Sequence, residues 1–522
     1  MRKIYYVSLL LLVIISSCSK SKNDTSPILT GPSKNGTALD LIKDSVYLYT
    51  KEESLWYDQI PTYAKFQPRS FTDPEDFTAL QKEMDALSQY PINPASGKPY
   101  ELSNDHPGEA KYSFIDDGSV SNELNGTNGD FGFNIQWDDP NNLSDLRVIY
   151  VYPNSPADKA GIKRGDKITN INGRTSLSYD ASGYGSGTSV NLNFVAAALD
   201  NSNTISIILT QHDGTTLTVT DMAIANYTIN PVLKETVLNQ GNGKKIGYLV
   251  FNVFTAVDNA GPQLDAAFAD FASKGITDLV VDLRYNGGGD VATAEYLDNL
   301  IVPSSASGTN MYTATYNSQL QKGIYPLLAT QYNIPTGYFT PTYPLNHPNF
   351  SKKGNLDINR VFFIITSSTA SAAELTINNL RPHMTVKYIG TTSYGKPVGF
   401  FEIPIGKYGL YTPEFATVNS AGQGGYYDGF TPGTTTYPGI LADDDETTDF
   451  GDPKEGLLSL AINYVNTGSF TTSSSQSVNS FALGKRSFSA DEKRSMLLKM
   501  KKNKFMGMVF RDKLKLKGPV RK

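Results

Sequence analysis

A serine and a lysine, 25 positions apart, are the strongest candidates for chemistry in this sequence. Ser371 lies where an apolar, β-branched run gives way to a helical pattern, and Lys396 lies in a short turn between a glycine and a proline. A serine hydroxyl becomes a nucleophile when a nearby base accepts its proton, and a neutral lysine amine can be that base. Each residue alone also has a structural interpretation: Ser371 and Glu374 match a helix capping box, and most single lysines lie on the surface.

A second strand-to-helix crossing, at residues 277–301, favours the chemical interpretation. It contains three consecutive glycines, which let bare backbone approach a ligand closely. If its strand and the strand before Ser371 belong to one parallel sheet, both crossings lie at the carboxyl ends of the strands, where ligands bind in such folds. Backbone amides at that edge, near a helix N-terminus, suit a developing oxyanion.

Three short motifs resemble those of the C-terminal processing (tail-specific) proteases, the S41 peptidases. They are DLRYNGGG at 282–289, SAAE at 371–374 and YGK at 394–396. Together with a PDZ-like segment upstream, the resemblance covers most of residues 38–465.

The resemblance implies a serine endopeptidase that cleaves proteins or peptides near apolar C-terminal tails. Ser371 would be the nucleophile that forms an acyl-enzyme, and Lys396 would be its base. The amides of Gly288 and Ala372 would hold the oxyanion. No cofactor and no metal are implied.

One position departs from the family pattern and keeps a second function open. Many members carry glutamine four residues after the lysine, where this chain has Phe400. Either another polar group holds Lys396 or the pair works as a simple dyad. The alternative function is a non-proteolytic protein of the same fold that binds a peptide or an apolar ligand, as the interphotoreceptor retinoid-binding proteins do.

A Ser-His-Asp triad is the alternative chemistry. The sequence has four histidines and no G-x-S-x-G elbow. Only His383 lies near Ser371 along the chain, beside a proline that ends the helix.

Length and composition indicate a globular protein of two or three domains. The chain has 522 residues, of which 39% are hydrophobic and 19% charged. Its net charge of −5 argues against a nucleic-acid partner.

The N-terminus predicts export to the cell envelope. A basic start precedes an apolar run at 4–15 that is too short to span a membrane. Cys18, the only cysteine, follows small residues in a pattern that resembles a bacterial lipobox. We therefore expect a lipoprotein signal peptide at 1–18 and lipidation of Cys18, with the protein anchored to the outer membrane on its periplasmic side or at the cell surface. A single cysteine allows no internal disulfide.

The fold class expected is a multidomain α/β chain. We predict a flexible tether at 19–36, a small helical N-terminal domain at 37–111, a PDZ-like β-rich domain at 112–228, an α/β serine protease core of the ClpP/crotonase-like type at 229–467, and a Ser/Thr linker with a basic, disordered tail at 468–522. Core strands are expected at 245–254, 277–284, 360–366 and 385–389, and core helices at 263–274, 291–301, 371–380 and 456–465.

The PDZ-like domain suggests a second peptide-binding place. PDZ domains bind a C-terminal peptide by strand addition, and loop amides hold its carboxylate. The loop would comprise Phe131, Gly132 and Phe133. Asp130 stands where glycine is usual and is expected to weaken carboxylate capture. The alternative is that this module only packs against the core.

Four other segments carry weaker expectations. Residues 310–349 are expected to form an insertion over the cleft, and 241–243 a hairpin turn rather than a phosphate loop. The acidic run at 443–446 is expected to be a solvated loop rather than a calcium site. From Lys485 onward, 14 basic residues face three acidic ones, and we expect a solvated tail that could contact anionic lipids.

Overall fold

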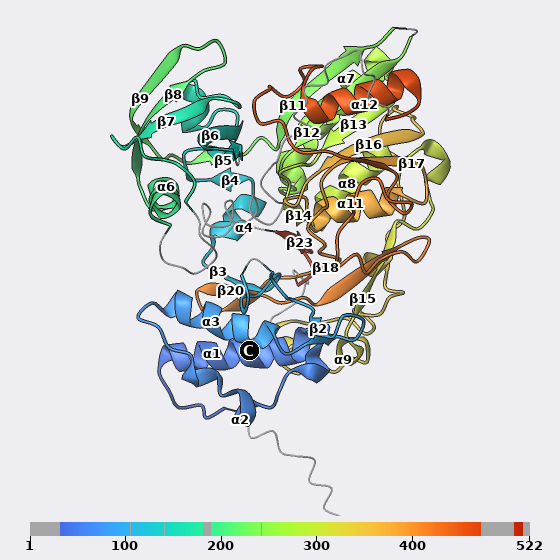
Figure 1. The fold of residues 1–522 in the computed structure, drawn as a ribbon. Coiled ribbons are helices and arrows are strands. Elements are labelled where there is room, and N and C mark those ends of the chain that lie inside the picture. The colour runs from blue at the N-terminus through green and yellow to red at the C-terminus, as the bar shows by residue number, and fades with distance from the viewer. Residues whose placement is uncertain are drawn as a thin grey trace, which may run out of the picture.

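The computed structural model describes residues 32–104, 106–139, 141–180, 189–241, 243–470 and 506–514. Figure 1 shows the PDZ-like domain and the α/β core side by side, with the N-terminal helices beneath them. Cys18, the signal segment, most of the tether and most of the tail lie outside the described residues. Within the described ranges, no helix combines the length and apolar character needed to cross a membrane.

A six-stranded sheet forms the centre of the core. Its first two strands pair as an antiparallel hairpin, as predicted for the segments on either side of 241–243, and the others run parallel. In spatial order the strands are β11 (Val232–Asn239), β12 (Lys245–Phe251), β13 (Asp278–Asp282), β16 (Arg360–Ile365), β17 (Thr385–Gly390) and β22 (Gly439–Leu441).

Helices cover both faces of this sheet because its strands are apolar on both sides. Leu249 and Phe251 of β12 pack with the helices α7 (Val257–Lys274), α8 (Val291–Ile301) and α11 (Ala372–Leu380). Tyr248 and Val250 point to the other face, which α12 (Gly456–Thr467) covers. β13 and β16 are parallel neighbours, so the two predicted strand-to-helix crossings lie at one edge, as expected.

The PDZ-like domain is a five-stranded antiparallel sheet with its own apolar core. β5 lies at one edge of the sheet and pairs within it only with β6. The elements are β5 (Phe133–Asp139), β6 (Asn142–Val151), α5 (Pro156–Lys159), β7 (Lys167–Ile171), α6 (Val190–Asp200), β8 (Thr204–Thr210) and β9 (Thr216–Ala223).

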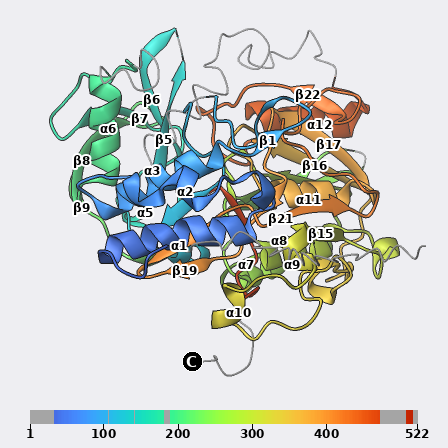
Figure 2. The same ribbon diagram turned by 90° about the horizontal axis from the view of Figure 1, so that it is seen from below.

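The N-terminal helices pack on the core through a small sheet. α1 (Ala38–Glu53) begins after the Thr37 capping box, and α3 (Asp76–Ser88) begins three residues later than Asp73, which accepts a hydrogen bond from the Glu75 amide. Figure 2 shows these helices lying across the underside of the molecule. The small sheet has the order β19 (Ile403–Ile405), β20 (Tyr408–Tyr411) and β3 (Phe114–Asp116).

Several short elements complete this half of the chain. β3 lies in the range predicted for the PDZ-like domain but pairs with β20 of the core. The others are α2 (Tyr63–Phe66), β1 (Ile92–Asn93), β2 (Lys98–Pro99), α4 (Ser119–Leu124), β4 (Thr127–Asn128) and β10 (Tyr227–Thr228).

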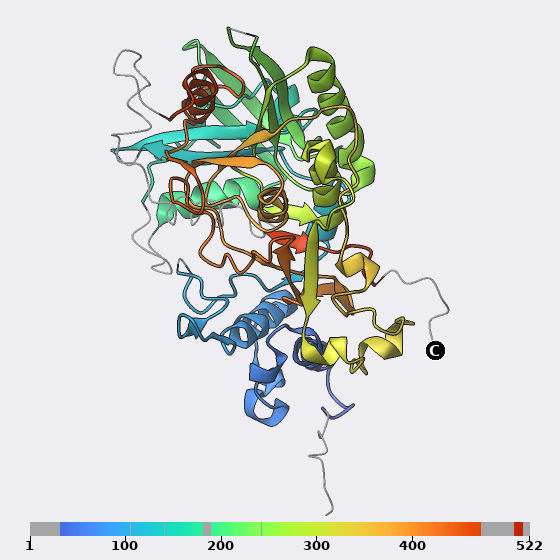
Figure 3. The ribbon, with the colours of Figure 1, turned by 90° about the vertical axis from the view of Figure 1, so that its right-hand side faces the viewer.

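The segment at 310–349 connects the core with the N-terminal helices. Its strand β15 (Tyr312–Tyr316) pairs with β21 (Phe415–Asn419), which also pairs with β18 (Val398–Gly399). Asn317 then donates hydrogen bonds to the last carbonyl groups of α1 and to that of Ser54. Figure 3 shows α9 (Ser318–Gln321) and α10 (Leu328–Gln331) beside the N-terminal helices.

Part of the basic tail is folded, which corrects our expectation of a solvated segment. Residues 507–509 form strand β23 (Gly507–Val509), which pairs in parallel with β14 (Gly288–Asp290). Met508 and Val509 are almost completely buried, because this short run is apolar although the residues around it are basic. The lysines from Lys515 onward lie outside the described residues.

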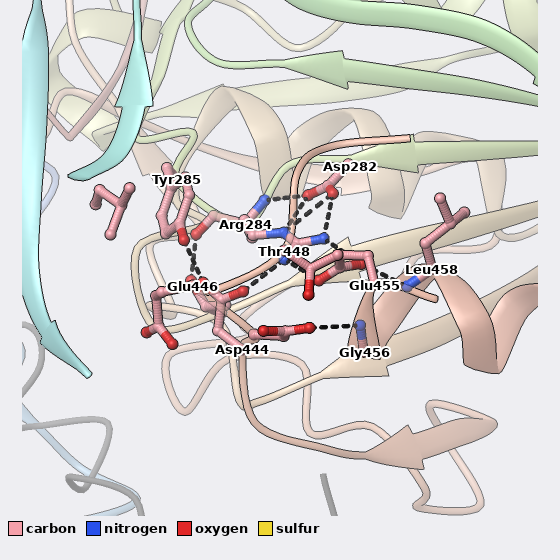
Figure 4. Close-up of polar contacts among 12 residues, drawn as sticks. Asp282, Arg284, Tyr285, Asp444, Glu446, Thr448, Glu455, Gly456 and Leu458 are labelled. Atoms are coloured by element: carbon pink, nitrogen blue, oxygen red, sulfur yellow. Dashed lines mark hydrogen bonds and ion pairs between the residues drawn. The ribbon is translucent and has the colours of Figure 1, made fainter. Parts of the chain in front are cut away.

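Most of the acidic run at 443–446 is removed from solvent, so the expectation of a solvated loop was wrong: Asp445 and Glu446 are buried, and the side chain of Asp444 is only 5% exposed. Asp444 pairs with the guanidinium groups of Arg284 from the core and Arg164 from the PDZ-like domain. Figure 4 shows Arg284 between Asp282, Asp444 and Glu455. The run can be buried because these two arginines pair with its carboxylates, and buried charges need such partners. The cluster also fastens the two domains together.

Candidate active site

Ser371 lies at the N-terminus of α11 in a strained conformation. Its φ of 59° and ψ of −109° lie outside the regions that non-glycine residues prefer. Such strain costs on the order of 1–3 kcal/mol and gathers at functional sites. The side chain is fully buried, and its Oγ makes no hydrogen bond with any described residue. Ser371 and Glu374 have the arrangement of a capping box at this helix start, but the hydroxyl makes no hydrogen bond of normal geometry there.

Glu374 connects the serine to the lysine loop. Its carboxylate accepts hydrogen bonds from the Ser371 amide at 2.9 Å and the Lys396 amide at 2.8 Å. It also accepts from Ser393 Oγ at 2.6 Å and the Gly395 amide at 2.8 Å. Burial raises the pKa of this carboxyl, although these hydrogen bonds oppose the rise. One carboxylate thus fixes the backbone at both candidate catalytic residues.

Lys396 is fully buried, and burial lowers the pKa of its amine well below the usual range. Its Nζ lies 3.8 Å from the ring centroid of Phe400 and 5.5 Å from that of Tyr112. It donates a hydrogen bond of 2.5 Å to the carbonyl oxygen of Met506 in the tail. Phe400 therefore touches the lysine, and desolvation favours the neutral amine that a base requires.

Two further buried carboxyl groups lie near Lys396. Glu101 and Glu414 both raise the pKa of the amine electrostatically, against the larger effect of desolvation. Glu101 is held by the amides of Tyr112 and Ser113 and by the Ser113 hydroxyl. Burial raises the pKa of both carboxyls, so each favours its neutral form more than in water.

The predicted oxyanion residues lie next to each other. A Cβ atom placed on Gly288 would lie 2.9 Å from the Ala372 amide nitrogen and 2.3 Å from the Gly507 carbonyl oxygen. The φ of +104° at Gly288 and this crowding both require glycine. The Gly288 amide donates to Asn286 Oδ1 at 2.8 Å, so it would have to exchange that partner to hold an oxyanion.

The histidines do not approach the serine. His383 contacts Ser420 Oγ at 2.9 Å, and Ser371 Oγ forms no hydrogen bond with a histidine or any other described residue. This arrangement gives no support to a triad. Among the described residues, no group of three or more potential metal ligands is arranged around a common point.

The predicted PDZ loop is partly closed by its own aspartate. Asp130 Oδ1 accepts hydrogen bonds from the Gly132 amide at 2.7 Å and from the Tyr227 hydroxyl at 2.8 Å. Phe131 and Phe133 on either side are buried. The Gly132 amide, which would meet a peptide carboxylate, already has an anionic partner.

Comparison with known proteins identifies the two modules. Residues 245–433 match the model of Peptidase family S41, and residues 147–191 match that of a PDZ domain. The core therefore carries an S41 peptidase domain, preceded by a PDZ domain. A crystal structure of a Bacteroides fragilis protein assigned to the S41 proteases shares this fold: it has a TM-score of 0.56 and 23% identity, covering 81% of this chain and 97% of that one.

Two curated relatives match at lower coverage. The chain is 26% identical over 292 residues to the carboxyl-terminal-processing protease of a Picosynechococcus species. It is 25% identical over 329 residues to the carboxy-terminal-processing protease of Bartonella bacilliformis. These matches cover 55% and 59% of this chain and span 58% and 64% of the length of the two relatives.

Sequence reasoning missed three features of the site. Glu374 was interpreted only as part of a capping box, although the structure gives it four hydrogen-bond donors. Glu101 and Glu414 gave no local signal. The tail strand had a local signal in the sequence. The run MGMVF at 506–510 is apolar although its neighbours are basic, and such a run is typical of a packed strand.

Proposed function

We propose that this protein is a serine endopeptidase of the C-terminal processing type, with Ser371 as nucleophile and Lys396 as base. The observation that carries the proposal is the single buried carboxylate of Glu374, which binds the amides of both residues at the N-terminus of α11. The S41 match over the core and the names of the curated relatives support the same reaction.

In the proposed reaction, neutral Lys396 accepts the proton of Ser371 Oγ as the oxygen attacks a peptide carbonyl. The tetrahedral oxyanion is held by the amide of Ala372, the first residue of α11, and by the amide of Gly288 after it leaves Asn286. The protonated amine then donates to the leaving amine. A water molecule, activated by the same lysine, finally hydrolyses the acyl-enzyme.

The test replaces Ser371 with alanine and measures cleavage of a protein that carries an apolar C-terminal tail. Ser371→Ala should lose all measurable cleavage and keep its fold, because Oγ makes no hydrogen bond of normal geometry and the Ser371 amide keeps its bond to Glu374. Ser420→Ala is the matched control, since Ser420 is exposed and binds His383. Cleavage by Ser371→Ala would exclude this serine as the nucleophile.

The second candidate function is a non-proteolytic peptide or ligand binder. It is favoured by the Phe400 ring, which covers the lysine amine at 3.8 Å. A serine-reactive acylating probe separates the two functions. The peptidase should be labelled at Ser371 in the wild-type chain and not in Ser371→Ala, whereas a binder should be labelled in neither.

Substrate recognition is proposed to use the edge strand β5. A C-terminal peptide would add as a sixth strand beside β5, in the manner of PDZ domains. Because Asp130 occupies the Gly132 amide, Asp130→Ala should tighten binding of an apolar C-terminal peptide several-fold in a fluorescence titration. Unchanged affinity would indicate that the module only packs against the core.

We also propose that the protein is lipidated at Cys18 and anchored to the outer membrane. The support is the lipobox-like sequence alone. Cys18→Ser should release the protein into the soluble fraction with its peptidase activity unchanged. Retention of both forms in the membrane fraction would point to the basic tail as the anchor.

A further inference from the structure

The tail occupies the groove beside the candidate nucleophile as an added strand. On one side β23 pairs with β14, and the Gly507 amide donates to the Gly287 carbonyl at 3.0 Å. On the other side the Phe400 amide donates to the Met508 carbonyl, and the Phe510 amide donates to the Phe400 carbonyl, both at 2.8 Å. Figure 1 shows β23 between β14 and β18 at the centre of the molecule. Extended peptides bind many proteins by such main-chain pairing.

The tail backbone also meets the residues proposed for catalysis. The Met506 carbonyl accepts the hydrogen bond of Lys396 Nζ, and the Gly507 carbonyl lies against Gly288 near the Ala372 amide. These are the positions at which the main chain of a substrate would have to lie. The strand therefore imitates a bound peptide.

Side chains beyond the strand anchor the tail in place. Lys513 is 3% exposed and donates to Asn346 Oδ1 at 2.6 Å, and its Nζ lies 4.3 Å and 4.7 Å from the rings of Tyr338 and Tyr316. The Phe510 ring packs on Phe415 at a centroid distance of 4.7 Å. The insertion thus builds an aromatic cage around this buried side chain.

The geometry around the tail does not favour its cleavage. Ser371 Oγ makes no hydrogen bond with Lys396, whose Nζ is directed to the Met506 carbonyl instead. The Gly288 amide is bound to Asn286, so half of the proposed oxyanion hole is not formed. A peptide held in this way fills the groove without being placed for attack.

We propose that residues 506–514 are an intramolecular inhibitor that fills the substrate groove and must leave before another peptide can enter. The inhibitory role rests on the proposed peptidase function, whereas occupancy of the groove does not. A segment in the same chain competes at an effective concentration on the order of millimolar. Its release should therefore increase the apparent affinity for a free peptide by at least about tenfold.

The test measures binding of a labelled synthetic peptide, MGMVFRDKL, which copies residues 506–514. The host is the full chain with Ser371→Ala, so that binding is measured without cleavage. Two tail substitutions are added separately: Phe510→Pro removes the amide that binds Phe400, and Lys513→Glu places an anion in the aromatic cage. Lys322→Glu, an exposed lysine of the insertion, is the control with the same charge change.

The tail substitutions should each increase peptide affinity at least about tenfold over the host, and Lys322→Glu should leave it unchanged. Circular dichroism verifies that each variant is folded. If one tail variant does not fold, the other still tests the proposal. Equal affinity in the host and a folded tail variant would overturn the proposal.

The same substitutions in the chain with Ser371 intact separate this inference from the proposed function. Faster cleavage of an external peptide supports both. Tighter peptide binding without any cleavage supports occupancy of the groove by the tail but rejects the proposed peptidase function. Robust cleavage with no change on tail release rejects the inhibitor alone.

Intact mass measurement decides between inhibitor and substrate. During prolonged incubation, the mass of the wild-type chain should show no cleavage within residues 506–514. Cleavage within this segment that disappears in Ser371→Ala would show that the tail is a substrate, which overturns the inhibitory role.

Discussion

Arg284 and Lys396 are both fully buried cations in the same core, yet their surroundings are opposite. Arg284 directs its planar guanidinium to Asp282, Asp444 and Glu455, and these carboxylates raise its pKa despite burial. The Lys396 amine donates a hydrogen bond to a neutral carbonyl oxygen, that of Met506, and is covered by the Phe400 ring. Burial therefore lowers its pKa.

The difference shows how one protein keeps one buried cation charged and shifts another toward the neutral form that the proposed base requires. Ion pairs with several carboxylates compensate the desolvation of a guanidinium and fix the domains in place. A desolvated amine without a direct carboxylate partner moves toward its neutral form. The first arrangement suits a stabilising role, and the second suits the proton transfer that we propose.

The largest expected effect is loss of the base. Lys396→Arg should lower kcat/KM at least about 10³-fold, because arginine does not deprotonate in a protein. Lys396→Met should be equally inactive and better tolerated in the buried site, and Lys407→Arg on the surface is the control. Peptide cleavage measures the loss. Wild-type rates in the arginine variant would make Lys396 structural, like Arg284.

Removal of the other cation should affect stability. Arg284→Met leaves buried carboxylates uncompensated and should reduce the free energy of unfolding by about 3–5 kcal/mol in urea titration. Arg360→Met breaks the pair between a partly exposed arginine, 32% accessible, and the buried Asp278, and should cost less than Arg284→Met because a single carboxylate loses its partner and water can reach the arginine's position. Similar losses in the two variants would contradict the assigned role of the buried cluster.

Glu374→Gln should have an intermediate effect. The amide group cannot accept from all four donors, so we expect a stability loss of about 1–3 kcal/mol. If Glu374 positions the two catalytic residues, kcat should fall about 10–100-fold with KM little changed. Glu75→Gln, at an exposed helix cap, is the control. A change in stability with no change in kcat would leave Glu374 purely structural.

The smallest effect concerns pH. Lys396 must be neutral to act as a base, so activity should rise as pH increases through its pKa. Phe400→Gln replaces an apolar ring by a hydrogen-bond acceptor and should raise that pKa. The acidic limb should move to higher pH by about one unit, equivalent to about 1.4 kcal/mol. As a control, Phe400→Leu keeps the apolar cover and should leave the pH–rate profile close to wild type. An unchanged profile in Phe400→Gln would show that the Phe400 ring does not set the pKa of Lys396.

Much of the core could be predicted because its signals are local. Helix α8 was expected at the observed residues, and β13 and β16 follow from continuous β-branched runs. The acidic run at 443–446 was misjudged, because its partners Arg284 and Arg164 are remote in the chain.

Residue types and spacing by themselves determined the two crossings and the positions of Ser371 and Lys396 as candidates, and a resemblance to a known signature indicated the PDZ-like module. Only the tertiary structure decided that Glu374 joins those two residues and that Phe400 covers the amine. It also decided that a strand from the far end of the chain fills the groove. The physical reason is that helices, strands and turns follow from neighbours in sequence, whereas desolvation and strand addition depend on groups that meet only after folding.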